Sequence, residues 1–205
     1  DILNTNYFSN NFVKLTGGVN FYKSDVLIEN SSFKNSLAED ALNIVKSKYN
    51  IKYSDFSNHK SDAFDSDFSN GNILNSKFTN IKGDAVDFSG TNALIKEVFF
   101  ENINDKAISA GEKSKVQVSN LKILNSKVGI ASKDSSILNG EQIFIQNSRL
   151  ADIAAFKKKD YFKGGKINLN NLKQKKLIIL AQKGSKIVID SKIVPITKFE
   201  TKIFY

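Results

Sequence analysis

The stretch Asp62-Ala63-Phe64-Asp65-Ser66-Asp67-Phe68 recurs in variant form one repeat earlier and one repeat later in the chain. The earlier copy begins Asp40-Ala41-Leu42, and the later copy begins Asp84-Ala85-Val86. Alanine occupies positions 41, 63, 85 and 107, at a constant step of 22 residues. Self-similarity at a fixed period of about 20–50 residues is typical of solenoids and related repeat folds. The period therefore predicts a repeat architecture.

A second series has the same period. An apolar residue is followed two positions later by Asn at Phe8/Asn10, Phe33/Asn35, Phe56/Asn58, Phe78/Asn80, Phe100/Asn102, Ile123/Asn125 and Ile145/Asn147. If each repeat is one coil, the apolar residues stack inside and the asparagines stack at a turn. We expect the side-chain amides to bond to the coils above and below and to satisfy buried backbone groups there.

Alternation of apolar and polar residues within each repeat indicates strands with one buried face. The segment Val86-Asp87-Phe88-Ser89 illustrates the pattern, with apolar residues at the even positions and polar residues at the odd ones. We therefore predict an all-β fold, a right-handed parallel β-helix with about 22 residues per coil and about seven or eight coils. Residues 1–160 form the coils in this prediction. Residues 161–205 form a C-terminal β cap of the same domain, with short strands at 167–172, 177–181 and 186–190.

Composition sets limits on the function. The chain has no Cys, which excludes disulfides and thiolate metal sites, and no apolar run approaches the ~20 residues that span a bilayer. Its net charge of +9 belongs to residues 151–205, which hold 13 Lys against four acidic residues. The chain opens on Asp1 in mid-pattern. We expect it to be a fragment of a larger protein with an additional upstream domain.

The repeats resemble those of the right-handed parallel β-helix proteins of the pectate-lyase-like superfamily. The resemblance rests on the segments 61–68, 83–90, 105–112 and 128–134. More narrowly, they are similar to the β-helix module that bacterial proteins carry beside spore-coat-kinase-like domains. Residues 182–190 resemble the C-terminal end of that module. The resemblance implies the fold and an extracellular or cell-surface location. The superfamily includes polysaccharide lyases, epimerases, hydrolases and inactive surface domains, so it implies no single activity.

The candidate functional site is a group of carboxylates. With even positions inward, Asp65, Asp67 and Asp87 project from one exposed face, and Asp65 lies about one strand spacing (~4.8 Å) from Asp87. The candidate ligand-binding residues are Asp62, Asp65, Asp67, Asp84, Asp87 and Asn43. Three interpretations stay open. The group is a Ca²⁺ site of Asp65, Asp67 and Asp87, a catalytic pair of carboxylates, or a solvated acidic patch.

Two further features bear on activity. His59, three residues before Asp62 in what we interpret as a turn, is a candidate catalytic partner of Asp65 and Asp87, whereas Arg149 lies about four coils away. The lysines of the C-terminal region, from Lys157 to Lys176, are candidates for contact with a polyanion. We do not expect nucleic acid as the partner, because no nucleic-acid-binding motif accompanies the charge.

The function predicted from these residues is a non-catalytic β-helix domain that recognises or positions a polysaccharide. The first alternative is a polysaccharide lyase, C5-epimerase or glycoside hydrolase that uses Asp65 and Asp87, with or without Ca²⁺. The second alternative is a purely structural spacer or adhesin. An exposed aromatic platform would favour sugar binding, and Tyr22 is the one residue that the alternation places on the outside near the carboxylates.

Overall fold

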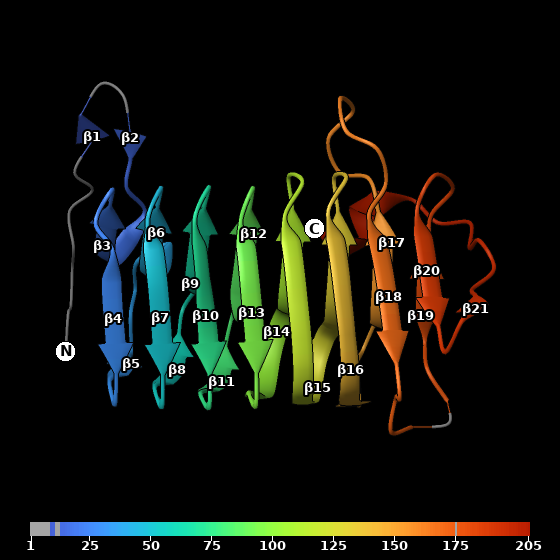
Figure 1. Ribbon diagram of the computed structural model, residues 1–205, viewed down its shortest axis with the longest axis horizontal. Coiled ribbons are helices and arrows are strands. Elements are labelled where there is room, and N and C mark those ends of the chain that lie inside the picture. Colours follow the sequence, from blue (N-terminus) through green and yellow to red (C-terminus); the bar gives the residue numbers. More distant parts are fainter. Residues whose placement is uncertain (1–8, 11–12, 175) are drawn as a thin grey trace.

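A computed structural model describes residues 9–10, 13–174 and 176–205. Its strands stack into a parallel β-solenoid of about eight turns, whose long axis runs horizontally in Figure 1 from β3 on the left to β20 on the right. Each residue pairs with the one a coil further on, as Asp65 does with Asp87. The predicted all-β parallel β-helix is confirmed. Outside the solenoid, β1 (Ser9–Asn10) and β2 (Val13–Lys14) pair in antiparallel fashion.

Three faces, which we call A, B and C, make up each coil. The long strands β14 (Phe99–Gly111), β15 (Lys115–Lys133) and β16 (Ile137–Gln146) run around corners and contribute to more than one face. Face A also contains β3 (Gly17–Tyr22), β6 (Asp40–Val45), β9 (Asp62–Asp67), β12 (Val86–Ser89), β17 (Ala151–Phe156) and β19 (Ile179–Ala181).

Faces B and C complete the coils. Face B contains β4 (Val26–Glu29), β7 (Lys48–Lys52), β10 (Asn70–Leu74), β13 (Asn92–Lys96), β18 (Lys166–Asn170) and β20 (Lys186–Ile189), with β21 (Lys192–Ile193) added in antiparallel fashion. Face C contains β5 (Ser32–Lys34), β8 (Asp55–His59) and β11 (Lys77–Ile81).

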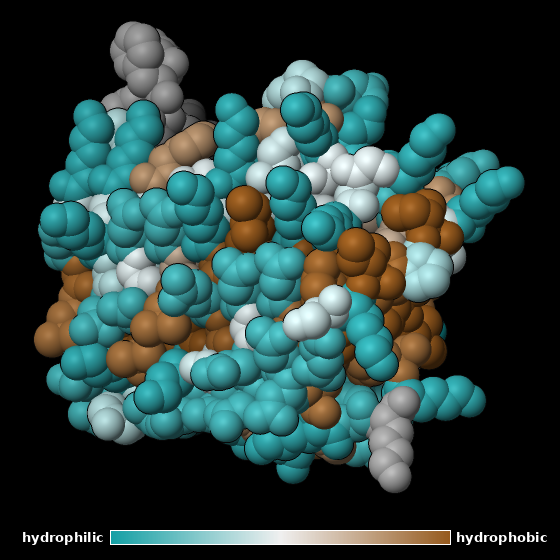
Figure 2. All heavy atoms as spheres, turned by 45° about the vertical axis from the view of Figure 1, so that its right-hand side comes forward, coloured by the Kyte–Doolittle hydropathy of each residue, from teal (hydrophilic) through white to brown (hydrophobic). Residues whose placement is uncertain are grey.

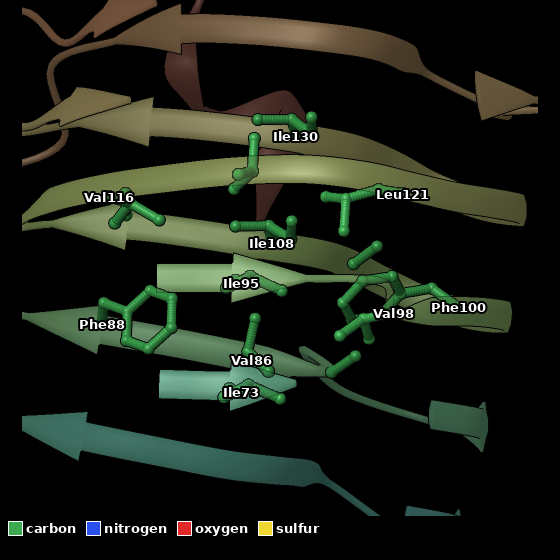
Figure 3. Packing of buried hydrophobic residues seen from close by; sticks show 14 of the residues in the cluster. Ile73, Val86, Phe88, Ile95, Val98, Phe100, Ile108, Val116, Leu121 and Ile130 are labelled. Carbon is green, nitrogen blue, oxygen red and sulfur yellow. The ribbon is translucent and has the colours of Figure 1, made fainter. Parts of the chain in front are cut away.

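The core is a set of columns that run along the solenoid. Phe33, Phe56, Phe78 and Phe100 stack with centroid separations of 4.7, 4.6 and 5.2 Å, as the sequence predicts. Figure 3 shows how isoleucines and valines from successive coils point into the same interior. Each fully buried side chain of this size contributes roughly 1.5–3 kcal/mol relative to an exposed one.

The predicted asparagine ladder exists, but its surroundings differ from the expectation. Side-chain amides are bonded at 3.0–3.1 Å from each coil to the next between Asn58, Asn80, Asn102, Asn125 and Asn147. These side chains are exposed rather than buried. Each residue has a positive φ of 54–61°. Asn is tolerated in this left-handed conformation better than most residues, which explains why it recurs there. The pair Phe8/Asn10 is not assessed, because Phe8 lies outside the described residues.

A buried ladder of hydroxyl groups satisfies backbone groups at a corner, which is the role that we expected of the asparagines. At the corner between faces A and B, each hydroxyl accepts the backbone N–H of the equivalent residue one coil earlier, at 2.8–3.2 Å. The acceptors are Ser47, Ser69, Thr91, Ser114 and Ser136. Backbone donors that the strands leave unpaired are thereby satisfied inside the solenoid.

The C-terminal strands extend the stack. β18, β19 and β20 pair in parallel with the preceding coils, so the predicted change from coils to cap at residue 160 does not coincide with a change in strand pairing. Figure 2 shows apolar atoms gathered at this end, where Ile193 and Ile196 are exposed. The chain then crosses onto face A and ends in the 3₁₀ helix η1 (Thr201–Phe204). Within the described residues, no helix is long and apolar enough to span a membrane.

Candidate functional site: a charged cluster on face A

Strand alternation places one row of polar side chains on the outside of face A. Asn43, Asp65, Asp87 and Ser109 are direct partners in the parallel register, each one coil from the next. The predicted stacking of Asp65 on Asp87 is therefore confirmed. Asp67 lies two residues further along β9 and is half-buried like Asp65 and Asp87. The row is neither fully solvated nor sealed from water.

A second row lies where the face A strands begin. Asp62 accepts the backbone N–H of Asp84 at 2.7 Å, and Asp84 accepts the backbone N–H of Lys106 at 2.9 Å. Carboxylate oxygens of Asp62, Asp84 and Asp87 lie within 4.8 Å of one another. The two rows thus converge on Asp87 and form what we call the charged cluster.

Two buried lysines belong to the charged cluster. Lys106 Nζ lies 3.3 Å from Asp84 and 2.7 Å from Asp105, and its side chain is 2% exposed. Lys133 Nζ donates to Ser109 at 2.8 Å and lies 3.5 Å from Asp87, two coils away. Gly111 makes that reach possible, because a Cβ there would lie 2.8 Å from Cε of Lys133.

Sequence reasoning missed Lys133 as a member of the charged cluster. The signal was present, because Lys133 follows Gly111 by one period in the row that contains Asp67. A lysine beyond a glycine on an outer face has room to lie back along the solenoid. Only the three-dimensional stacking, however, shows that its amine reaches Asp87.

The surroundings shift the pKa values of the carboxyl groups in opposite directions. Burial, reinforced by the neighbouring charge of Asp84, raises the pKa of Asp62 to about 8. Burial, followed by Asp67 and Asp87, also raises the pKa of Asp65 well above its usual range. Burial acts the same way on Asp87, but the nearby Lys133 and Ser109 outweigh it and hold the pKa of Asp87 below its usual range. At neutral pH the cluster therefore contains both a protonated and an ionised carboxyl group.

Asn43 is buried more deeply than the carboxyl groups of the row. Its side chain is 1% exposed, and its amide nitrogen donates to Asp65 at 3.3 Å and to Asp67 at 3.4 Å. Its amide oxygen is buried and has no hydrogen-bond partner among the described residues. An unpaired buried acceptor costs roughly 1–3 kcal/mol, which a ligand hydroxyl beside it would offset.

Part of the basic C-terminal region borders the cluster. Lys158 Nζ lies 4.3 Å from the ring centroid of Tyr205, and Lys106 Nζ lies 5.3 Å from it. Burial, followed by repulsion from Lys133, lowers the pKa of Lys158. Lys159 forms an ion pair with Glu112. The acidic and basic regions that the sequence separates therefore meet at one place on face A.

His59 lies apart from this arrangement. It is the last residue of strand β8 rather than part of a turn, and its ring is buried, with Nδ1 accepting the backbone N–H of Ser36 at 3.2 Å. Burial lowers the pKa of His59 to about 4, so its ring is neutral at pH 7. Its proposed partnership with Asp65 and Asp87 stays a prediction without a contact to support it. Arg149 bonds to the backbone oxygen of Asn104.

The residues fit a Ca²⁺ ion poorly. Within the described part of the chain, the carboxylates that converge closely enough to share an ion are Asp62, Asp84 and Asp87, not the predicted set of Asp65, Asp67 and Asp87. Lys106 already pairs with Asp84, and Lys133 with Asp87. A divalent cation among these ammonium groups would meet repulsion that the remaining carboxyl groups do not offset.

Comparisons with known proteins identify no family for this chain. No protein-family model matches the chain, and a search of curated proteins found no match. The Agl-KA catalytic domain resembles it at 14% identity and a TM-score of 0.40, over 80% of this chain and 41% of that one. HetL, a pentapeptide repeat protein from the cyanobacterium Nostoc sp. strain PCC 7120, does so at 8% identity and a TM-score of 0.22, over 85% and 86% of the two chains. The resemblance to the module beside spore-coat-kinase-like domains gains no support from these comparisons. The parallel β-solenoid rests on the strand pairing.

Proposed function

We propose that the chain binds a carbohydrate on the outer side of face A, at Asn43, Asp65, Asp67 and Asp87, as a non-catalytic module of an extracellular protein. The observation that carries the proposal is the mixture of hydrogen-bonding groups in one row, whose carboxyl groups are half-buried. The raised pKa of Asp65 favours the protonated form, which donates, and the lowered pKa of Asp87 favours the ionised form, which accepts. The buried oxygen of Asn43 is an unused acceptor among the described residues. A sugar hydroxyl is both a donor and an acceptor, so such a row suits it.

The geometry of the row supports a chain-like ligand. Its members repeat once per coil along a straight stack, so one linear molecule can contact several of them in the same way. Alanine or serine in place of these acids would fold with less electrostatic cost, because crowded carboxyl groups repel one another. The presence of acidic residues in the row is consistent with a role in binding.

Binding is tested with isothermal titration calorimetry on neutral and acidic polysaccharides. We expect the Asp65→Asn/Asp87→Asn variant to lose at least tenfold in affinity, about 1.4 kcal/mol. The matched control is Asp55→Asn/Glu141→Gln, which removes two exposed acids from faces C and B. Equal loss in the control would show a general charge effect. Failure of the wild type to bind any polysaccharide would leave the spacer or adhesin role.

A second candidate function, polysaccharide cleavage, is favoured by one observation. Asp62 and Asp87 have pKa values shifted in opposite directions, and their oxygens lie within 4.8 Å of each other. A protonated acid beside an ionised carboxylate at roughly 5 Å is the arrangement of retaining glycosidases. Release of reducing ends from the same panel, with and without Ca²⁺, tests this function. Release that Asp62→Asn or Asp87→Asn abolishes would establish an enzyme, and no release from any polymer would remove hydrolysis.

A further inference from the structure

Lys106 and Asp84 form a contact that the proposed function does not use. Their side chains are 2% and 7% exposed, and Lys106 Nζ lies 3.3 Å from Oδ1 of Asp84. The backbone holds the pair from both sides, because Ala85 N–H donates to the Lys106 carbonyl and Lys106 N–H donates to the Asp84 carboxylate. The amine is therefore kept against one particular carboxyl group.

We propose that Lys106 and Asp84 react with each other to form an isopeptide bond, a covalent link between neighbouring coils. The carboxyl groups of Asp62 and Asp87 lie within 4.8 Å of Asp84 and are in place to carry the proton. The ring of Tyr205 lies 5.3 Å from Lys106 Nζ and covers it from solvent. The inference goes beyond carbohydrate binding and stands or falls independently of it.

The reaction balances without an external reagent. The Lys106 ammonium gives a proton to the Asp84 carboxylate, and the free amine attacks Cγ of the resulting carboxylic acid. A C–N bond forms and a C–O bond breaks. Protonated Asp62 gives its proton to the departing hydroxyl, which leaves as water, and takes one proton back from the attacking nitrogen. The net change is one ammonium plus one carboxylate giving one amide plus one water.

Three physical factors favour this reaction at Lys106. Holding the reactants together replaces a bimolecular encounter by an effectively unimolecular step. Exclusion of water removes the competing hydration of the ion pair and opposes hydrolysis of the amide. A nearby carboxyl group that both accepts and donates a proton supplies general acid–base catalysis. Asp105 also contacts Lys106, at 2.7 Å, but its side chain is 28% exposed and the water-exclusion argument applies to it less well.

The bond is tested by mass spectrometry of the denatured wild-type protein. We expect a mass lower than that of the sequence by one water molecule. Digestion after glutamate then locates the loss, because Asp84 lies in the fragment 40–97 and Lys106 in the fragment 102–112. The expected product is these two fragments joined, with one water missing. Trypsin is unsuitable, since a missed cleavage between adjacent fragments gives the same mass as a cross-link.

Each other outcome overturns the proposal. Full mass shows that the pair is a salt bridge only. Loss of water within fragment 102–112 alone assigns the link to Asp105, and loss within fragment 40–97 alone indicates an internal dehydration. A link between fragments 40–97 and 113–141 assigns it to Lys133 and Asp87.

Two variants check the chemistry in the folded protein. Lys106→Arg keeps the positive charge but lacks the amine, and we expect it to show the full mass. Asp62→Asn keeps the shape of the proton carrier, and we expect a cross-linked fraction reduced at least tenfold. Circular dichroism confirms that each variant is folded before its mass is interpreted. An unchanged cross-linked fraction in folded Asp62→Asn would overturn the role of Asp62.

Discussion

Face A carries two different surfaces on one continuous row of positions. In the earlier coils the row reads Asn43, Asp65, Asp87, and in the later coils the same row reads Ala131, Ala154, Leu180. The first part is polar, and its two carboxyl groups are half-buried. The second part is covered by the segment 197–205, whose Phe204 is fully buried and stacks on Phe156 at 4.3 Å.

The difference shows that strand geometry does not decide the chemistry of an outer position. The backbone repeats with the same register in both parts. The type of residue at each outer position therefore depends on whether another segment covers that position. Where the chain returns and excludes water, the residues of the row are apolar, since a charge there would lose its hydration. Where nothing of the described chain covers it, acids are retained. The boundary between the two parts falls at Ser109, Lys133 and Tyr205, which is where the charged cluster ends.

The largest expected effect comes from removing the ring on which the covering segment packs. Phe156→Ala should lower the free energy of unfolding by about 3–5 kcal/mol, because a fully buried aromatic side chain is lost. Tyr22 occupies the same row near the other end of face A and is only half-buried. Tyr22→Ala should therefore cost less than half as much. Urea unfolding monitored by circular dichroism measures both, and similar losses would contradict the distinction between covered and open parts.

Placing an acid in the covered part and an alanine in the uncovered part should change the stability by very different amounts. Ala154→Asp places an acid under the covering segment and should cost about 3 kcal/mol or more, because the charge has no partner there. Asp65→Ala in the open part removes a crowded carboxyl group and should be neutral or slightly stabilising. Thermal unfolding of both variants at pH 7 provides the comparison. A destabilised Asp65→Ala would mean that Asp65 has a structural role.

The two ladders provide a smaller contrast between buried and exposed positions. Ser69→Ala should cost about 1–3 kcal/mol, because the Ser47 N–H loses its acceptor in a buried site. Asn80→Gly, which keeps the left-handed conformation available, should change stability by only a few tenths of a kcal/mol, although it breaks the exposed amide ladder. Denaturant unfolding tests both. A large loss in Asn80→Gly would show that the amide bonds, not the conformation, are what stabilise that corner.

The smallest effect should appear in the pH dependence of stability. The raised pKa values of Asp62 (about 8) and Asp40 (about 6) mean that the folded state holds these protons more tightly, so stability falls as pH rises through them. The lowered pKa of His59 (about 4) acts oppositely, but only between pH 4 and its usual value of 6.5. Above pH 6.5 the fall is expected chiefly from Asp62.

Melting temperature should accordingly drop by about 2–4 °C between pH 6.5 and 8.5 in the wild type. Asp62→Asn should reduce this difference, since the amide does not titrate. The comparison uses the change between the two pH values within each protein, so an overall shift in stability does not affect it. A melting temperature that rises with pH over this interval would contradict the raised pKa of Asp62.

Much of the fold could be predicted because it is encoded locally. The step of 22 residues and the alternation around Phe64 specify coils and buried faces without reference to distant contacts. The stacking of Asp65 on Asp87 follows from the same step. The reach of Lys133 over Gly111 could not be predicted, because it depends on how far a flexible side chain extends along the stack.

The features that the sequence analysis mispredicted or missed have physical explanations. Asparagine was assigned to a buried ladder because its amide can bond both ways, whereas its left-handed backbone is what the corner requires. The serines that fill the buried ladder carry little signal of their own in a sequence rich in serine. The return of residues 197–205 onto face A was also beyond prediction, since it is a contact between segments with different patterns.

The parallel stacking has a consequence for how length can vary in such a chain. Each coil contacts chiefly the coil before and the coil after, and the three corners recur at the same positions in each. Insertion of one whole period would lengthen the rod without disturbing any corner. Insertion of a single residue within a strand would instead reverse which side chains face inward. The length of the solenoid can therefore change in steps of one coil.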